Sequence, residues 1–384
     1  DDYDPAYHVQ HYALPAPGRL EDLLTLVSRA HERVLDRNRP LWELHVIEGL
    51  QGDRFAIYCK VHHALVDGVG ALRMIDALFS DSAGKRVDFK KAEVLAREHH
   101  EKYQPLRQLG RAGAELRRHS RALPQVYTHL ASMGRDALLG RKDAPPLPFT
   151  APHTVFNTDI DARREIILSQ LPLKQLRTLA TRSGGTLNEV LIAVCGGALR
   201  AYLLEQGELP RETLEAGIPM SIKRDGEEAG NQVCFMISPF FTNERDPWRR
   251  LKRVIKVSQQ AKKDVRDMSR TAAQDFTNAL MMPTILLTLT GNAGKVRPAL
   301  NCIVSNVPGS AKPLYLDGAE LESLYPLSVV TDGIAINITV VSYQNTLCVA
   351  ITSCPTLLPD IGGLGKLIQG SFKELKQAER EQRK

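Results

Sequence analysis

The sequence lacks several features that identify common protein classes. No run of about 18 uninterrupted apolar residues occurs, and the first residues read DDYDPAY, so neither a transmembrane helix nor a signal peptide is expected. The six cysteines form no CxxC pair, and most lie in apolar runs, as reduced, buried thiols do. These absences favour a cytoplasmic protein.

Motifs for nucleotide, serine and metal chemistry are also missing. We find no Walker-type loop, no GxGxxG, no GxSxG and no HExxH. The usual carriers of nucleotide hydrolysis, nicotinamide chemistry and nucleophilic serine catalysis are therefore absent. Four potential metal ligands lie close together at Cys59, His62, His63 and Asp67, but they match no usual zinc spacing, so no metal site is expected.

The positive charge is concentrated in one segment. The chain has a formal charge of +6, whereas residues 84–142 alone hold 14 Lys/Arg against 6 Asp/Glu, a local net of +8. This segment lacks interleaved aromatic residues, so no nucleic-acid partner is expected. A solvated linker face, an anionic membrane surface and a polyanionic ligand all remain compatible with the charge.

The length of 384 residues predicts two lobes, because single cores usually stop growing below this size. We expect an N-terminal lobe at 1–80, a basic helical crossover at 81–150 and a C-terminal lobe at 151–384. The first lobe should contain a helix at 20–37, strands at 43–47 and 55–61, and a helix at 68–79. In the second we expect strands near 165–168, 218–222, 233–241, 301–307, 334–343 and 346–352, and helices at 187–204, at 248–282 and at the C-terminus. This mixture predicts an α/β fold with mixed sheets flanked by helices.

The sequence HHALVDG at 62–68 follows a strand and precedes a helix. A histidine at such a turn can take a proton from a hydroxyl near neutral pH, and His63 is the candidate general base. Asp67, four residues later, either orients the ring or pairs with a cation such as Arg224. Gly68 lets the backbone bend into the helix. The alternative is that His62 and His63 only satisfy the end of a strand.

The histidines are unevenly distributed along the chain. All eleven lie at or before His153, so the second half of the chain has no imidazole to act as a base. If both lobes form the active site, the first supplies the base and the second supplies walls and hydrogen-bond donors. We therefore expect a channel between the lobes.

Five motifs together carry a family resemblance. They are PLWELHVIEGL (40–50), HHALVDG (62–68), NEVLIAVCGGALRAYL (188–203), SNVPGS (305–310) and DGIAINITVVSY (332–343). Their order resembles the bacterial wax ester synthase/acyl-CoA:diacylglycerol acyltransferase family, which belongs with chloramphenicol acetyltransferase-like acyltransferases and peptide synthetase condensation domains. The resemblance implies the two-lobed fold of that superfamily.

This sequence differs from the family's usual pattern in two respects. Family members usually have Asn-Asp at Asn188-Glu189, and they usually begin several tens of residues earlier, so the numbering here is expected to start inside a longer chain.

The resemblance implies transfer of a fatty acyl group from acyl-CoA to a long-chain alcohol or a diacylglycerol. Acyl-CoA is a substrate, and no cofactor is implied. His63 would be the general base and Asn306 the donor to the developing oxyanion, with Asn337 and Asn188 as weaker candidates for that donor. A turn asparagine that bonds its own backbone is an equal interpretation of Asn306. The remaining implied site residues are His62, Asp67 and Gly68 beside the base, and Trp42, Asn188, Ser305 and Asn337 for substrate binding.

The apolar runs at 233–241 and 279–289 fit an acyl tunnel or plain core. The second run could also rest on a membrane or lipid-droplet surface, where the basic segment would favour anionic headgroups. Two other functions stay open. One is a condensation-type acyltransferase that takes its acyl group from a carrier protein, and the other is a non-catalytic lipid-binding protein.

Overall fold

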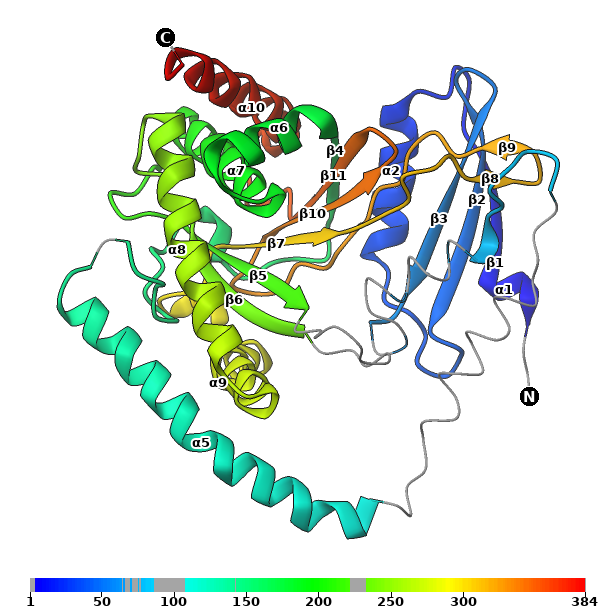
Figure 1. Ribbon diagram of the computed structural model, residues 1–384. Coiled ribbons are helices and arrows are strands. Elements are labelled where there is room, and N and C mark those ends of the chain that lie inside the picture. Colours follow the sequence, from blue (N-terminus) through cyan, green and yellow to red (C-terminus); the bar gives the residue numbers. More distant parts are fainter. Residues whose placement is uncertain are drawn as a thin grey trace.

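The computed structural model describes residues 4–63, 65, 70, 75, 77–85, 108–141, 143–221 and 233–383. Two β-sheets of different size form the centres of two lobes (Figure 1). The first lobe contains α1 (Pro5–His8), β1 (Val9–Ala13), α2 (Leu20–Glu32), β2 (Trp42–Leu50) and β3 (Arg54–Val61).

The first lobe is a three-stranded sheet in the order β1-β2-β3, with α2 packed against one face. β1 pairs with β2 in parallel and β2 with β3 antiparallel. The spacing of Leu23, Val27 and Ala30 places them on one side of α2, where they form a buried cluster with Ile47 and Tyr58 of the sheet. Sheet residues alternate between faces, so Glu43, His45 and Ile47 of β2 are buried.

The second lobe is built on a six-stranded sheet in the order β4-β11-β10-β7-β5-β6. Its strands are β4 (Glu165–Pro172), β5 (Glu215–Ser221), β6 (Val233–Pro239), β7 (Cys302–Val307), β10 (Ile336–Tyr343) and β11 (Thr346–Ser353). Its helices are α6 (Leu173–Ser183), α7 (Leu187–Glu205), α8 (Pro247–Asp267), α9 (Arg270–Leu289) and α10 (Leu364–Glu381), with short 3-10 helices at Val155–Asn157, Ala293–Lys295 and Ile361–Gly363.

Helices α6, α7, α8 and α10 gather on one side of the large sheet and bury the main core (Figure 1). α7 lies close to its neighbours because of its glycine pair: a Cβ at Gly196 would lie 2.4 Å from the carbonyl oxygen of Phe240. Among the described residues, α7 is also the helix whose length and composition would suit a membrane span. However, 72% of that helical window is buried inside the protein, as in a core helix.

The opposite face of the large sheet meets the first lobe. Ile166 of β4 belongs to the same buried cluster as the apolar face of α2. Residues 308–331 leave the sheet after β7 and form the small hairpin of β8 (Tyr315–Leu316) and β9 (Ala319–Glu320) beside the first lobe (Figure 1). There Ser80 pairs with Tyr315, and Arg54 forms an ion pair with Glu322. We refer to residues 308–331 as the crossing segment.

A long helix, α5 (Gln108–Leu138), follows the edge of the second lobe and crosses α9 (Figure 1). Ala122 and Val126 of α5 pack with Phe276 of α9, and His119 lies 2.8 Å from Asp275. The described part of the basic segment is therefore largely a helix fixed to the second lobe. The lobe boundaries at 80 and 150 remain predictions.

The helix predicted at 20–37 extends too far at its C-terminal end. α2 ends at Glu32 rather than at residue 37, and Val34, whose spacing continues the apolar face of the helix, is 86% exposed. The chain leaves the helix because Arg33 is extended and the Asp36 carboxylate accepts a hydrogen bond from the Asn38 amide, which closes a turn. The helix expected at 68–79 lies largely outside the described residues.

Candidate active site

The tandem histidines lie just beyond the last pair of the β2–β3 ladder, which joins Trp42 to Val61. The His62 amide donates to the carbonyl oxygen of Leu41 at 2.9 Å, and the His62 carbonyl accepts from the Leu65 amide at 2.9 Å. The backbone thus turns away from the sheet directly after the strand. This geometry agrees with the strand-end turn expected from the sequence.

The imidazole of His63 is exposed, and within the described part of the chain it has no hydrogen-bond partner. A ring in this state can accept the proton of an incoming hydroxyl. Asp67, Gly68 and Arg224 lie outside the described residues, so their predicted roles stay predictions.

Trp42 begins β2 and is half-buried opposite Val61. Its carbonyl oxygen accepts a hydrogen bond from Nδ1 of His8 at 2.8 Å, and the two rings stack with centroids 4.6 Å apart. The start of β2 is therefore fixed next to the turn that carries His63. A substrate-binding role for Trp42 remains a prediction.

In the second lobe, two of the predicted site residues meet. The side-chain nitrogen of Asn306, near the end of β7, donates to Oδ1 of Asn188 in the first turn of α7 at 2.5 Å. Both side chains are half-buried. The pair lies at the N-terminal end of a 19-residue helix, where unpaired amides and the helix dipole create positive potential.

Glu189, the residue that departs from the family's Asn-Asp pattern, has a structural role. Its carboxylate accepts from the Thr186 amide at 2.6 Å and forms a capping box with the Thr186 side chain. The other oxygen lies 2.6 Å from Nζ of Lys262 in α8, and the Glu189 side chain is completely buried. The acidic group therefore anchors the start of α7 and holds Asn188 in place.

Ser305 and Asn337 lie on the other face of the sheet, because successive residues of a strand alternate. Ser305 pairs in register with Thr339, whereas Asn306 pairs with Val340, a core residue on the helix side. Asn337 is 3% exposed; its amide nitrogen donates to the Val329 carbonyl at 3.2 Å, and its oxygen accepts from Thr339. The sheet thus separates Asn306 and Asn188 from Ser305 and Asn337.

Several buried polar residues of the first lobe were not predicted from the sequence. His45 lies 3.2 Å from Glu43, and its ring stacks against Tyr12 and packs beside Tyr58. Burial lowers the pKa of His45, although Glu43 raises it in part. The alternation in ELHV predicts that the apolar Leu44 and Val46, rather than Glu43 and His45, face the core, so this pattern held no usable signal for the buried pair.

The run at 233–241 forms β6, and its described side chains are buried on both faces. Met236 joins the main core, whereas Cys234 packs with α9. The residues of this run therefore fill core space, as the alternative interpretation predicted.

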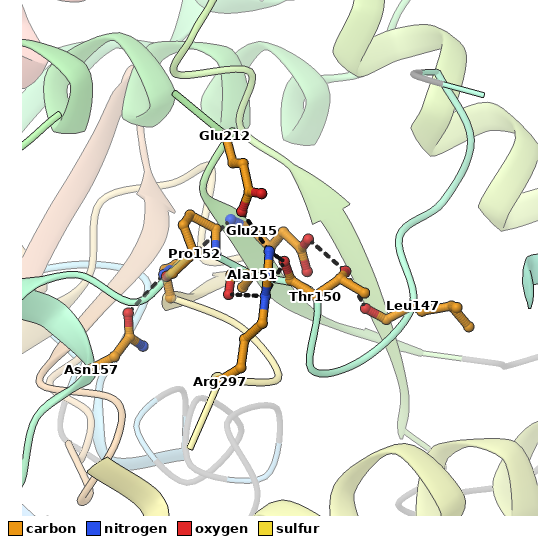
Figure 2. Close-up of polar contacts among 9 residues, drawn as sticks. Leu147, Thr150, Ala151, Pro152, Asn157, Glu212, Glu215 and Arg297 are labelled. Atoms are coloured by element: carbon orange, nitrogen blue, oxygen red, sulfur yellow. Dashed lines mark hydrogen bonds and ion pairs between the residues drawn. The ribbon is translucent and has the colours of Figure 1, made fainter. Parts of the chain in front are cut away.

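A second unpredicted group, around Glu215, fixes the end of the crossover to the large sheet (Figure 2). Oε1 of Glu215 accepts from the Thr150 hydroxyl at 3.0 Å, whereas Oε2 is buried without a partner among the described residues. The Arg297 guanidinium donates to the carbonyls of Thr150 and Ala151 and pairs with Glu212 (Figure 2). Burial raises the pKa of Glu215 from 4.5 to about 8.

This carboxyl should make stability depend on pH. Because folding raises its pKa, the neutral form stabilises the protein fully below pH 4.5, and that contribution is lost as the pH rises toward 8. We expect Glu215→Gln to be more stable than the parent at pH 8, by on the order of 1–3 kcal/mol, and to differ less at pH 5. Urea unfolding at both pH values measures this difference.

The exposed partner of Arg297 provides the control. Glu212→Gln should change stability by less than about 0.5 kcal/mol at either pH. An equal response of Glu215→Gln at both pH values would contradict the assignment of a neutral buried carboxyl.

Two mixed sheets with helices on one side, joined by a crossing segment and with an exposed histidine at a strand end, define a two-lobed acyltransferase of the chloramphenicol acetyltransferase-like fold. The model of the wax ester synthase/diacylglycerol acyltransferase catalytic domain matches residues 1–191, and that of the C-terminal domain of the same family matches residues 229–376. The chain belongs to this family, and it is an O-acyltransferase.

Named relatives agree with this membership. O-acyltransferase WSD of Acinetobacter baylyi is 34% identical over 95% of this chain and 79% of its own length. Mycobacterium tuberculosis tgs2, named as a probable diacylglycerol O-acyltransferase, is 35% identical over 98% of this chain and 83% of its own.

Solved structures also agree. A wax ester synthase/diacylglycerol acyltransferase from Marinobacter aquaeolei VT8 superposes with a TM-score of 0.72 and 29% identity, over 99% of this chain and 82% of the other. The starter condensation domain of rhizomide synthetase superposes with a TM-score of 0.55 at 14% identity, over 98% of this chain and 78% of that domain, which shows a shared fold.

Proposed function

We propose that this acyltransferase moves a fatty acyl group from acyl-CoA to the hydroxyl of a long-chain alcohol or a diacylglycerol. The observation that supports the proposal is the exposed His63 imidazole, free of hydrogen-bond partners in the described part of the chain, at the end of β3. Family membership supports the substrate class, since the family is that of wax ester synthases and diacylglycerol acyltransferases and one relative is named as a probable diacylglycerol O-acyltransferase.

His63 takes the hydroxyl proton as the alcohol oxygen attacks the thioester carbonyl carbon. The tetrahedral intermediate then collapses, the C–S bond breaks, and the imidazolium returns the proton to the departing thiolate of CoA. The products are an ester and free CoA, and the imidazole is again neutral. One titrating group is sufficient, and no covalent enzyme intermediate is needed.

Asn306 is our proposed donor to the carbonyl oxygen as it becomes negative. Its side chain lies on the helix face of the sheet, so the proposal requires the thioester to reach it around the end of β7 at Val307. One N–H of its amide binds Asn188, which leaves the second N–H for a substrate. The contact with Asn188 fixes the plane of the amide, so little reorganisation is needed during reaction. Asn337 suits this role less, because its amide already donates to Val329 and is almost fully buried.

The reaction is tested directly with palmitoyl-CoA and either hexadecanol or a diacylglycerol. We expect release of CoA thiol together with the matching ester, detected by mass. Thiol release without ester would indicate hydrolysis only. Ester formed from a carrier-bound acyl group but not from acyl-CoA would favour the condensation-type alternative.

We also propose that α9 rests on a lipid surface. Its C-terminal half carries an outward apolar stripe of Met282, Ile285, Leu286 and Leu289, and the last of these is 77% exposed. The exposed Lys295 lies six residues beyond the end of the helix at Leu289. An apolar stripe bordered by basic groups is typical of interfacial helices, and the basic α5 crosses the same helix.

Liposome flotation measures this attachment. The double substitution Leu286→Asp and Leu289→Asp should reduce the vesicle-bound fraction more than about 10-fold, because each leucine contributes roughly 1.5–3 kcal/mol when buried. Val34→Asp, at an exposed apolar position of the first lobe, is the matched control and should bind as the parent does. Equal flotation of all three proteins would contradict the proposal, and equal binding with and without anionic lipid would contradict its electrostatic part.

A further inference from the structure

Two residues of β3 form hydrogen bonds to the C-terminal end of α2. Nδ1 of His31 lies 2.9 Å from the hydroxyl oxygen of Tyr58. Nζ of Lys60, two residues further along β3, donates to the carbonyl of Ala30 at 2.9 Å and also to that of Arg33. Two residues of the strand that leads to His63 therefore bind the same helix end.

The same helix turn is held by the second lobe. Nε2 of His31 lies 3.0 Å from the carbonyl oxygen of Ser328 in the crossing segment, and Glu32 accepts from the Arg164 amide at 3.1 Å. The next carbonyl of the crossing segment, that of Val329, is bound by Asn337 of β10. The His31 ring thus joins β3 of the first lobe to the crossing segment. The crossing segment is bound in turn to β10 of the large sheet, through Val329 and Asn337.

The hydrogen-bond partners of His31 permit one arrangement of protons. A carbonyl only accepts, so Nε2 must carry the hydrogen that faces Ser328. In a neutral ring Nδ1 is then the acceptor, and the Tyr58 hydroxyl donates to it. Burial lowers the pKa of His31. The hydrogen bond to Ser328 raises it in part, whereas the charges of Lys60 and Arg164 lower it further, and the net lowering of the pKa favours the neutral ring. Burial also raises the pKa of Tyr58, which keeps its proton.

We infer that His31 and Tyr58 are positioning residues that hold His63 at its working place relative to the second lobe, by tying β3 to the crossing segment. This inference rests on the proposed role of His63. Tyr58 and Lys60 precede His63 by five and three residues, roughly 16 Å and 10 Å along an extended strand. β3 remains paired with β2 up to Val61, so a displacement at Tyr58 is carried to the turn.

The inference is tested by steady-state kinetics of Tyr58→Phe and His31→Phe with saturating alcohol. We expect each to lower kcat about 10- to 100-fold, since misplacing a catalytic group by about 1 Å has effects of this size. The KM for acyl-CoA should change less than about threefold. The double variant should lose no more than either single one, because both break the same bridge. His31→Gln, whose amide can still donate to Ser328, should recover part of kcat.

Two controls separate positioning from folding. Tyr12→Phe removes a hydroxyl in the same sheet whose one hydrogen bond among the described residues is to the side chain of Gln10, two residues away. Val27→Ala removes buried apolar contacts from the same helix. Both should retain kcat when assayed well below their melting temperatures. If the kcat of Tyr58→Phe is unchanged, or falls only as far as that of Val27→Ala at equal loss of Tm, the inference is wrong.

Amide hydrogen exchange measures, independently of activity, whether the His31–Tyr58 contact stabilises β3 and the crossing segment. Tyr58→Phe should accelerate exchange in residues 54–61 and 326–331, whereas Tyr12→Phe should leave both segments as in the parent. Unchanged exchange would overturn the inference. If His63→Ala retains activity, the proposed function fails, and exchange alone then decides whether the bridge couples the lobes.

Discussion

We expect His63→Ala to lower turnover by about 10²–10⁴, which is the usual contribution of a positioned general base. The physical reason is that the alcohol must lose its proton as its oxygen attacks, and the second half of the chain has no histidine to replace the missing ring. The ring is exposed and unbonded among the described residues, so its removal leaves no buried group unpaired. CoA release measured with palmitoyl-CoA and hexadecanol gives the rate.

His11→Ala is the matched control for this loss. His11 is also an exposed histidine of the first lobe, where it pairs only with Glu48 at the surface. Its replacement should leave turnover within about twofold of the parent, because exposed ion pairs contribute little. If His63→Ala were to keep full turnover with an unchanged melting temperature, the general-base assignment would be wrong, and the non-catalytic lipid-binding alternative would gain support.

Asn306→Ala should give the second largest loss, about 10²–10³ in kcat, as expected for removal of one oxyanion donor. KM for acyl-CoA should change much less, because the donor acts on charge that develops only in the transition state. Asn306→Asp should not restore the rate, since a carboxylate is nearly isosteric but offers no N–H to the oxyanion. Measurement of kcat and KM with both variants separates these outcomes.

The control for Asn306 is Asn345→Ala, an exposed asparagine in the turn between β10 and β11. Its carbonyl accepts from the Leu173 amide, and the alanine variant keeps that bond. We expect parental kinetics from it. A rise in KM with unchanged kcat in Asn306→Ala would mean that Asn306 binds the ground state and the transition state equally, and the oxyanion role would then have to be abandoned.

Much of the fold could be predicted from local patterns. The strands at 55–61, 301–307 and 346–352 are alternating or continuous apolar runs, and the structure has β3, β7 and β11 there. α6 was missed although Leu173, Leu176 and Leu179 carry helical spacing, so the signal was present. The end of α2 was misplaced because its apolar spacing continues to Val34, whereas a local Asp36 turn ends the helix.

The candidate site was predictable in part. The turn at His62 and His63 follows from a strand that ends where its partner β2 begins. The grouping of Asn306 with Asn188 did not follow from the sequence, because 118 residues separate them. The same is true of His31 and Ser328, which are 297 residues apart. Contacts between distant segments depend on how the sheets are ordered and stacked, which local periodicity does not specify.

By itself the sequence determined which residues can do chemistry: one tandem histidine pair in the first lobe, no imidazole after residue 153, and motifs that identify an acyltransferase family. These conclusions needed only residue identity and short-range spacing. The tertiary structure decided which candidates share a surface, since the alternation of β7 places Ser305 toward one face and Asn306 toward the other. It also decided that Glu189 anchors α7 and that His31 joins the lobes, because a polar side chain takes its role from the partners that folding brings within hydrogen-bond distance.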